Sequence, residues 1–283
     1  MKTLILSTDF STAGDHAVKY GYHLAKSIKA NVVLCHAFMI PVEVPQAGVV
    51  VWPMDTYDEI ARDNEEKLNR LKTSLNRLHE EGDFMPDIKV LNETGPVADV
   101  IRNAANSEKT DLIVIGTHHP GLDTLLMGNH DKVLIDHLNK PLLLVPPNTK
   151  LRLPRKIAFA SDFKHPDRDM QLILSLMPLI SALSAELYIT HIQPSGQRTD
   201  QLWLSQFLID IVKRATYPIV FSRIIDNDDS LSALGKLCNG KDNDLLIMVH
   251  RRRSFFEELF KRSYTKKTAK NTKVPLLVLH PAE

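Results

Sequence analysis

The chain has 283 residues, of which 43% are hydrophobic and 24% charged, and its formal net charge is +1. This length predicts two domains of ordinary size, and the balanced charge excludes the basic footprint of a general nucleic-acid binder. No apolar run approaches the ~18 residues that span a bilayer, and the N-terminal apolar run is too short for a signal peptide. We therefore expect a cytoplasmic protein that contacts neither nucleic acid nor membrane.

The first half of the chain alternates short apolar runs with longer stretches of helical period. The expected strands are 2–8, 31–38, 87–92, 111–116 and 141–146, and the expected helices are 11–30, 56–82, 96–107 and 128–139. The second of these helices carries leucines at helical spacing and ends at Gly82. Strands that alternate with helices predict a parallel sheet with helices on both faces.

The second half of the chain repeats the first in the same order. The matched pairs are KTLILSTDF (2–10) with KIAFASDF (156–163), NVVLCHAF (31–38) with ELYITHIQ (186–193), DLIVIG (111–116) with DLLIMV (244–249), and KPLLLVPP (140–147) with VPLLVLHP (274–281). Four matches in order indicate a duplication, and the Pro-rich, basic stretch 146–156 is typical of a linker. The predicted fold class is α/β, with two tandem doubly wound domains at 1–147 and 155–283, joined by linker 148–154. Each is expected to hold a five-stranded, mostly parallel sheet.

Open sheets of this kind bind ligands at the carboxyl ends of their strands. Asp9 follows the first strand, Ala37 lies at the end of the second, and Gly116 ends the fourth. Gly116 is the first of three glycines in the stretch IVIGTHHPGLDTLLMGNH (113–130), which runs from a strand to a helix start. That order brings backbone N–H groups to a phosphate. The alternative interpretation is that these glycines serve only as turn and helix-boundary residues.

Several motifs in this order resemble a tandem member of the universal stress protein family. They are the opening TDF, the strand end VLCHAF, the segment ETGPVADVI, the turn DLIVIGTHH, the helix start LLMGN and the closing PLLLV. The resemblance covers essentially the whole chain and implies the adenine-nucleotide alpha-hydrolase-like fold. In nucleotide-binding members, it implies an aspartate that meets the adenine after the first strand. It also implies a loop of the form Gly, two residues, Gly, nine residues, Gly-Ser/Thr around the ribose and phosphates.

Carried onto this chain, the resemblance gives Asp9 the adenine side and makes Gly116 the first glycine of the loop. His119 stands where the second glycine is expected, and only eight residues, in place of nine, separate it from Gly128. A histidine adopts positive φ poorly and blocks close approach of the backbone, so weakened binding of ATP or a related adenine nucleotide is expected. The predicted nucleotide-binding residues are Thr8, Asp9, Ala37, Ile115, Gly116, Gly121, Gly128, Asn129 and His130.

The corresponding stretch of the second half, MVHRRRSFFEELFKRSYTKK (248–267), contains no glycine, and Arg262-Ser263 stands where Gly-Ser is expected. We therefore expect no phosphate-binding loop in the second half. What remains is a basic cluster around Phe255 and Phe256, formed by Arg251, Arg252, Arg253, Lys261, Arg262, Lys266 and Lys267. This basic cluster is either a site for an anion or acidic partner or a solvated basic face.

Other chemistry has little support in the sequence. Four histidines lie within residues 118–137, but neither a His-Glu-x-x-His pattern nor a cysteine pair accompanies them, so no metal is expected. Cys35 and Cys238 are expected to be buried and reduced. Neither a Gly-x-Ser-x-Gly nor a P-loop Gly-Lys-Ser/Thr occurs, and we expect no enzymatic activity.

Two functions remain open. The first is a stress-responsive regulatory protein that binds an adenine nucleotide in the first domain only, with the second domain completing an intramolecular pseudo-dimer. The second is an interaction or scaffold protein, with unnamed partners, in which both sites are vestigial. In the architecture that the resemblance implies, the last strands of the two halves pair with each other, so the chain is expected as a monomer or as a homodimer.

Overall fold

The computed structural model describes residues 2–39, 54–117, 135, 138–161, 163–193, 201–215, 217, 219–226, 230–250 and 273–280. The first half contains β1 (Lys2–Ser7), α1 (Thr12–Ile28), β2 (Ala30–Phe38), α2 (Met54–Asn76), β3 (Ile88–Thr94), α3 (Val97–Ser107), β4 (Leu112–Gly116) and β5 (Leu142–Val145). The second half contains β6 (Lys156–Ser161), α6 (Pro166–Ala182), β7 (Glu186–Gln193), α7 (Gln201–Ala215), β8 (Val220–Asp226), α8 (Ser230–Leu237), β9 (Leu245–Val249) and β10 (Leu276–Leu279).

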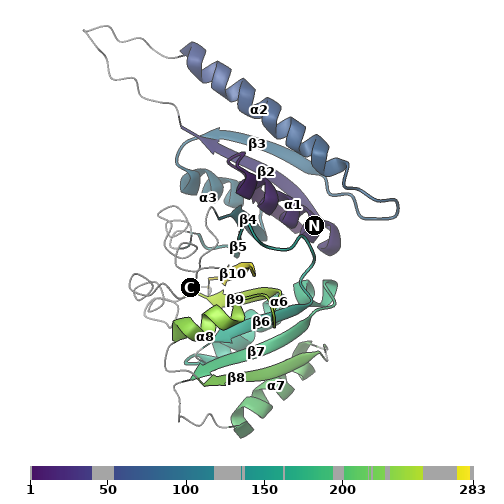
Figure 1. The fold of residues 1–283 in the computed structure, drawn as a ribbon, viewed down its shortest axis with the longest axis vertical. Coiled ribbons are helices and arrows are strands. Elements are labelled where there is room, and N and C mark those ends of the chain that lie inside the picture. The colour runs from purple at the N-terminus through teal and green to yellow at the C-terminus, as the bar shows by residue number, and fades with distance from the viewer. Residues whose placement is uncertain are drawn as a thin grey trace, which may run out of the picture.

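The strands form one continuous sheet in the order β3-β2-β1-β4-β5-β10-β9-β6-β7-β8 (Figure 1). All neighbouring strands are parallel except β5 and β10, which pair antiparallel with Leu144 opposite Leu276. Each half therefore has the same strand order, and the two halves join through their last strands. The predicted α/β class with doubly wound halves is confirmed.

Helices cover both faces of the sheet. Side chains alternate between the two faces along each strand, so each face has its own buried cluster. Leu4 and Leu6 of β1 belong to one buried cluster, which also contains side chains of α1, α2, α6 and α7. Ile5 belongs to a second buried cluster, with side chains of α3 and α8. Because both faces are covered, the strands are apolar at nearly every position rather than at alternate ones.

The five strands predicted in the first half are confirmed to within two residues at each end. The predicted end of the helix at Gly82 is wrong, because α2 ends at Asn76. Leu75 is fully buried, whereas Leu78 is 36% exposed, so the buried face stops one turn earlier than the leucine spacing suggests. The Lys26 ammonium donates to the Leu78 carbonyl at 3.0 Å and fixes the chain beyond the helix end. The helix predicted over 128–139 lies almost entirely outside the described residues.

The segment 146–155 connects β5 to β6 and contains the predicted linker. The domain boundaries themselves stay predictions. Cys35 and Cys238 are both buried and free, as expected, and burial raises the pKa of each thiol to about 12. None of the helices in the described part of the chain combines the length and apolar character needed to cross a membrane.

Candidate functional site

In the first half, the strand order reverses beside β1. The chain passes from β1 to β2 on one side and later returns to β4 on the other side. A crevice for ligands forms at the carboxyl ends of the strands where the order of an open sheet reverses. Asp9 follows β1 and Gly116 ends β4, so both lie at this switch point.

The turn between β1 and α1 holds the carboxylate of Asp9 in place. The backbone N–H and the hydroxyl of Ser11 donate to Asp9 Oδ1 at 3.0 and 2.6 Å. Ser11 caps α1, since its Oγ accepts from the Gly14 N–H at 3.0 Å. Phe10 adopts φ 60 between them. Asp9 is exposed, so its carboxylate is both oriented and accessible.

Gly116 is fixed by packing against the first turn of α1. A Cβ at this position would lie 2.5 Å from the carbonyl oxygen of Ala13 and 3.1 Å from the Cα of Gly14. A Cβ at Gly14 would in turn lie 2.4 Å from Asp9 Oδ1. Both glycines are therefore required to bring α1 against β4 and the Asp9 turn, whether or not a phosphate binds there.

The structure brings only some of the predicted nucleotide-binding residues together. Thr8 and Asp9 lie in the turn before α1, with Thr8 buried. Ala37 packs against the cluster on the α3 face, and Ile115 is buried within that cluster. Gly121, Gly128, Asn129 and His130 lie outside the described residues, and so does the basic cluster of the second half. The binding role of the whole set stays a prediction.

The structure reveals a polar network at this turn. From the sequence, His36 and His191 are expected to share a packing or hydrogen-bonding role in the two halves, but the carboxylates of the network were missed. The Thr8 hydroxyl accepts from the Phe10 N–H at 2.9 Å and donates to Asp15 Oδ1 at 3.5 Å. The carbonyl of Thr8 lies 2.8 Å from His36 Nδ1. Since a carbonyl only accepts, Nδ1 carries the proton.

The second half contains the same network. The Ser161 hydroxyl accepts from the Phe163 N–H at 3.0 Å and donates to Asp169 Oδ2 at 2.7 Å. His191 Nδ1 lies 3.3 Å from the Ser161 carbonyl. The sequence repeat aligns His36 with His191, but it does not align the two carboxylates, those of Asp15 and Asp169. Asp15 lies seven residues after its hydroxyl partner, whereas Asp169 lies eight after its own, so their positions in the repeat do not align.

Burial determines the ionisation of this network in the first half. Burial raises the pKa of Asp15, and the charge of Lys19 opposes this shift only in part. Burial lowers the pKa of His36, against the smaller opposing effect of its bond to Thr8. The imidazole is therefore held neutral and serves to orient the turn rather than to carry charge.

Aromatic side chains flank the network in both halves. The Phe10 and His36 rings lie 4.3 Å apart. In the second half Phe163 contacts Trp203 at 5.6 Å and Phe207 at 5.4 Å. In the first half the ring contacts continue from His36 to Phe38 and from Phe38 to Tyr57, so an aromatic cluster flanks the network in both halves.

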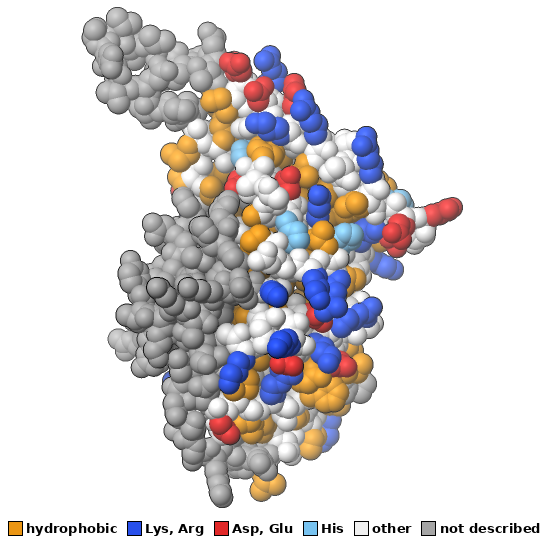
Figure 2. Space-filling view, in the orientation of Figure 1, with side chains coloured by type: hydrophobic (Ala, Val, Ile, Leu, Met, Phe, Trp, Pro, Cys, Tyr) orange, Lys and Arg blue, Asp and Glu red, His pale blue; other side chains and the backbone are white. Residues whose placement is uncertain are grey.

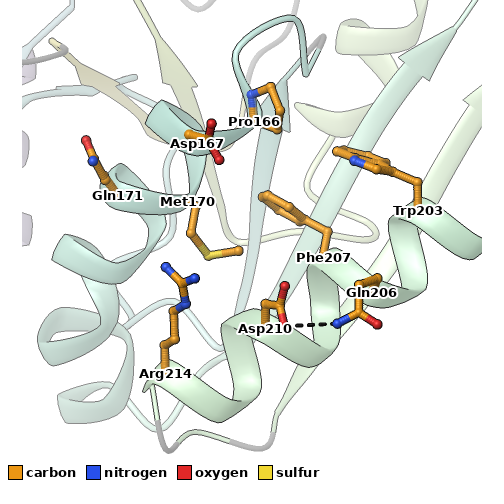
Figure 3. A pocket seen from close by; sticks show the side chains of 9 residues that line it. All are labelled: Pro166, Asp167, Met170, Gln171, Trp203, Gln206, Phe207, Asp210 and Arg214. Atoms are coloured by element: carbon orange, nitrogen blue, oxygen red, sulfur yellow. Dashed lines mark hydrogen bonds between the residues drawn. The ribbon is translucent and has the colours of Figure 1, made fainter.

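This second aromatic cluster borders a pocket of 410 Å³ between α6 and α7 (Figure 3). Met170 and Phe207 are largely buried, and Asp167, Asp210 and Arg214 add charges of both signs. The Gln206 amide donates to Asp210 at 3.0 Å. The remaining lining residues are Pro166, Gln171 and Trp203. Of the predicted nucleotide-binding residues, those within the described part of the chain do not line this pocket.

No group of three His, Cys, Asp or Glu side chains suited to a metal ion occurs among the residues that the structure describes. The clustered His118, His119, His130 and His137 lie outside that part of the chain. The expectation of no metal therefore stays a prediction.

The fold and the switch-point turn define a doubly wound α/β protein with a candidate ligand site in its first half. The model of the universal stress protein family matches residues 1–146. The chain therefore belongs to the universal stress protein family.

Solved structures show the same fold over the whole chain. A universal stress protein from Archaeoglobus fulgidus DSM 4304 has a TM-score of 0.68 at 15% identity and covers 99% of this chain and 97% of its own. A putative universal stress protein from Pseudomonas aeruginosa UCBPP-PA14 has a TM-score of 0.55 at 12% identity, with 99% and 94% covered. A functionally unknown protein from Pseudomonas aeruginosa PAO1 has the same TM-score and identity, with 99% and 93% covered. No curated protein matches the chain.

Proposed function

We propose that this member of the universal stress protein family is a regulatory protein without enzymatic activity that binds ATP or another adenine nucleotide in its first half. The observation that carries the proposal is the exposed Asp9 carboxylate, held by two hydrogen bonds from Ser11 at the switch point of the sheet. An oriented carboxylate accepts a hydrogen bond from an exocyclic amine such as that of adenine. Gly116 brings the start of α1 against this site.

The sequence of the second half supports the proposal that nucleotide binds in the first half only. Its stretch 248–267 lacks every glycine of the expected loop, so backbone N–H groups cannot approach phosphates as closely there. We propose that this half completes the sheet through β10 and binds no nucleotide. The cytoplasmic location and the protein partners stay predictions.

A release experiment followed by titration tests this proposal. Freshly purified protein is denatured and filtered, and the filtrate is examined by chromatography and mass spectrometry for an adenine nucleotide. The emptied protein is then titrated with Mg-ATP by calorimetry. Nucleotide released from the protein, or rebound at about one per chain, is the expected result.

Two matched variants locate the site. Asp9→Asn keeps an oxygen for the Ser11 bonds but places an amide donor beside the adenine amine, so it should weaken ATP binding about tenfold or more. Asp162→Asn changes the repeat equivalent of Asp9, which lies outside the described residues, and should leave affinity and stoichiometry unchanged. Equal loss in both variants would contradict binding in the first half alone.

A third variant tests the predicted loop. Gly128→Val should abolish binding while leaving the circular dichroism spectrum unchanged, because a branched side chain blocks close approach of the loop to phosphate. Full affinity in this variant would remove Gly128 from the site. An empty filtrate together with no binding at millimolar ATP would overturn the proposal as a whole.

The alternative function, a protein-interaction module, is favoured by the edge strand β8. This strand ends the sheet, and it leaves Phe221 45% and Ile224 36% exposed. Exposed apolar edge strands are surfaces on which another chain can pair. If the protein assembles as a homodimer through β8, sedimentation velocity should detect the dimer, and Phe221→Lys should convert it to monomer. A wild-type monomer would count against this assembly.

A further inference from the structure

A second pocket lies where the two halves meet. It has a volume of 210 Å³ and combines one residue of α1, the segment after β5, and the turns before β9 and β10. Its lining residues are Tyr20, Asn148, Thr149, Lys150, Arg152, Asn239, Gly240, Lys241, Asn243, Asp244, Lys273 and Val274. None of the predicted nucleotide-binding residues that the structure describes is among them.

The lining of the pocket is strongly positive. Arg152 is paired with Asp244 at 2.5 Å, which leaves the pocket without a carboxylate to balance the other cations. Lys150, Lys241 and Lys273 have no ion pair within the part of the chain that the structure describes. Figure 2 shows lysine and arginine side chains gathered near the middle of one face, over the region where the halves meet. Three lysines that line one small pocket attract an anion to it.

The same lining contains a buried hydroxyl that lacks a partner among the described residues. Thr149 is only 6% exposed, and its Oγ1 makes no hydrogen bond with any residue that the structure describes. Buried hydroxyl groups are nearly always hydrogen-bonded in proteins. Thr149 lines the pocket, and rotation about its χ1 bond would let the unsatisfied hydroxyl meet a ligand oxygen there.

The part of the lining that comes from the second half is held in place by hydrogen bonds from backbone N–H groups. Asn239 Oδ1 accepts from the Lys241 N–H at 2.9 Å, and Gly240 adopts φ +73 in this turn. The Lys273 N–H donates to the Cys238 carbonyl at 3.0 Å. These bonds fix the backbone of Lys241 and Lys273, two of the lysines that line the pocket.

We propose that this pocket binds a phosphate group, either as inorganic phosphate or as the phosphate of a small phosphomonoester. Lysines bind phosphate as point charges, and the Thr149 hydroxyl supplies a directional donor. The pocket is smaller than the ~300–1,000 Å³ typical of sites for drug-sized ligands, so it suits a small anion better than a nucleotide. Because its lining comes from α1, the linker and the second half, a bound phosphate would tie the two halves together.

Calorimetric titration with inorganic phosphate tests this site, at an ionic strength held constant with sodium chloride. Wild-type protein should bind saturably at about one phosphate per chain. Lys241→Ala combined with Lys273→Ala should weaken binding about tenfold or more, since it removes two charged donors. Thr149→Val should weaken binding several-fold and, because the hydroxyl has no partner without ligand, should leave the melting temperature in phosphate-free buffer unchanged or raised. Lys213→Ala, an exposed lysine on α7 outside the pocket, is the matched control and should bind as wild type does.

The outcomes separate this site from the proposed nucleotide site. The lysine positions are exposed, so the double variant should fold normally even if Thr149→Val does not. Phosphate binding that is unchanged in the double lysine variant, or absent in wild type, would overturn the proposal. Glycerol 3-phosphate titrated in parallel distinguishes the two sources: tighter binding than inorganic phosphate supports a phosphomonoester, and weaker binding supports the free anion.

Discussion

Gly116 shows how a single glycine can have a structural requirement that sequence motifs attribute to a ligand. We predict that Gly116→Ala destabilises the protein by about 1–3 kcal/mol, because the new Cβ would lie 2.5 Å from a backbone oxygen of Ala13. Gly21→Ala is the comparison variant, since its Cβ would meet only side-chain methyl groups, of Leu6 at 2.4 Å and of Val114 at 3.3 Å, which can shift further than a backbone oxygen can. Urea denaturation of both variants should rank Gly116→Ala as clearly the less stable. Equal stability would mean that α1 shifts freely against β4.

The carboxylate of Asp15 should give the stability a distinctive pH dependence. Burial raises its pKa above the ordinary value of 3.8, so the folded state holds this proton more tightly than the unfolded chain does. Stability therefore decreases as the pH rises through the interval between these two pKa values. Asp15→Asn should abolish that decrease while keeping an oxygen for the Thr8 hydroxyl.

Asp83 provides the opposite control, because the hydrogen bond from Lys26 lowers its pKa. Its contribution to stability is present above its unfolded pKa and is lost as the pH falls through the folded value. Urea denaturation across the acidic range should therefore show changes of opposite sign for Asp15→Asn and Asp83→Asn. The same pH profile in both variants would contradict the assignment for Asp15.

At the scale of the elements, the periodicity of the apolar residues and the composition of the segments predicted most of the fold but only part of the candidate site. Apolar runs such as Leu112–Gly116 are buried on both faces, and this burial is why they could be identified without alternation. The end of α2 could not be predicted in the same way. Leu78 continues the helical spacing of the leucines but remains 36% exposed. The Thr8 network escaped prediction because Asp15 is an ordinary first-turn acid in the sequence. Only the path of the turn brings it to the hydroxyl.

Pro178 interrupts the ladder of α6 on its exposed side. A proline within a helix lacks the N–H that would bond the carbonyl four residues earlier. We predict that Pro178→Ala stabilises the protein by roughly 1–2 kcal/mol, the gain in helix energy being partly offset by the greater freedom of the unfolded chain. Pro166→Ala, at the first position of the same helix, should give no gain because proline is favoured there. Thermal and urea unfolding should both detect this difference.

At the scale of the whole molecule, the sequence shows the duplication, but only some of its structural consequences can be predicted from the sequence. The apolar runs at the end of each half required covered edges, and the pairing of β5 with β10 provides them. The pocket between the halves could not be predicted, since Tyr20, Thr149 and Lys241 are far apart in the chain and line one pocket only in the folded structure. The shared sheet therefore creates surfaces that neither half carries alone.

The β5–β10 junction should also make the two halves unfold together. Leu277 of β10 is 1% exposed and lies opposite Leu143 of β5. Leu277→Asp would bury an unpaired carboxylate at this junction, which is strongly unfavourable. Hydrogen exchange followed by mass spectrometry should then show lost protection in β4 and β5 as well as in β9, because both halves depend on this pairing. Phe221→Asp, on the exposed edge strand β8, should affect only β7 and β8. If Leu277→Asp leaves the exchange of β4 and β5 unchanged, the halves are independent folding units that share a sheet without sharing stability.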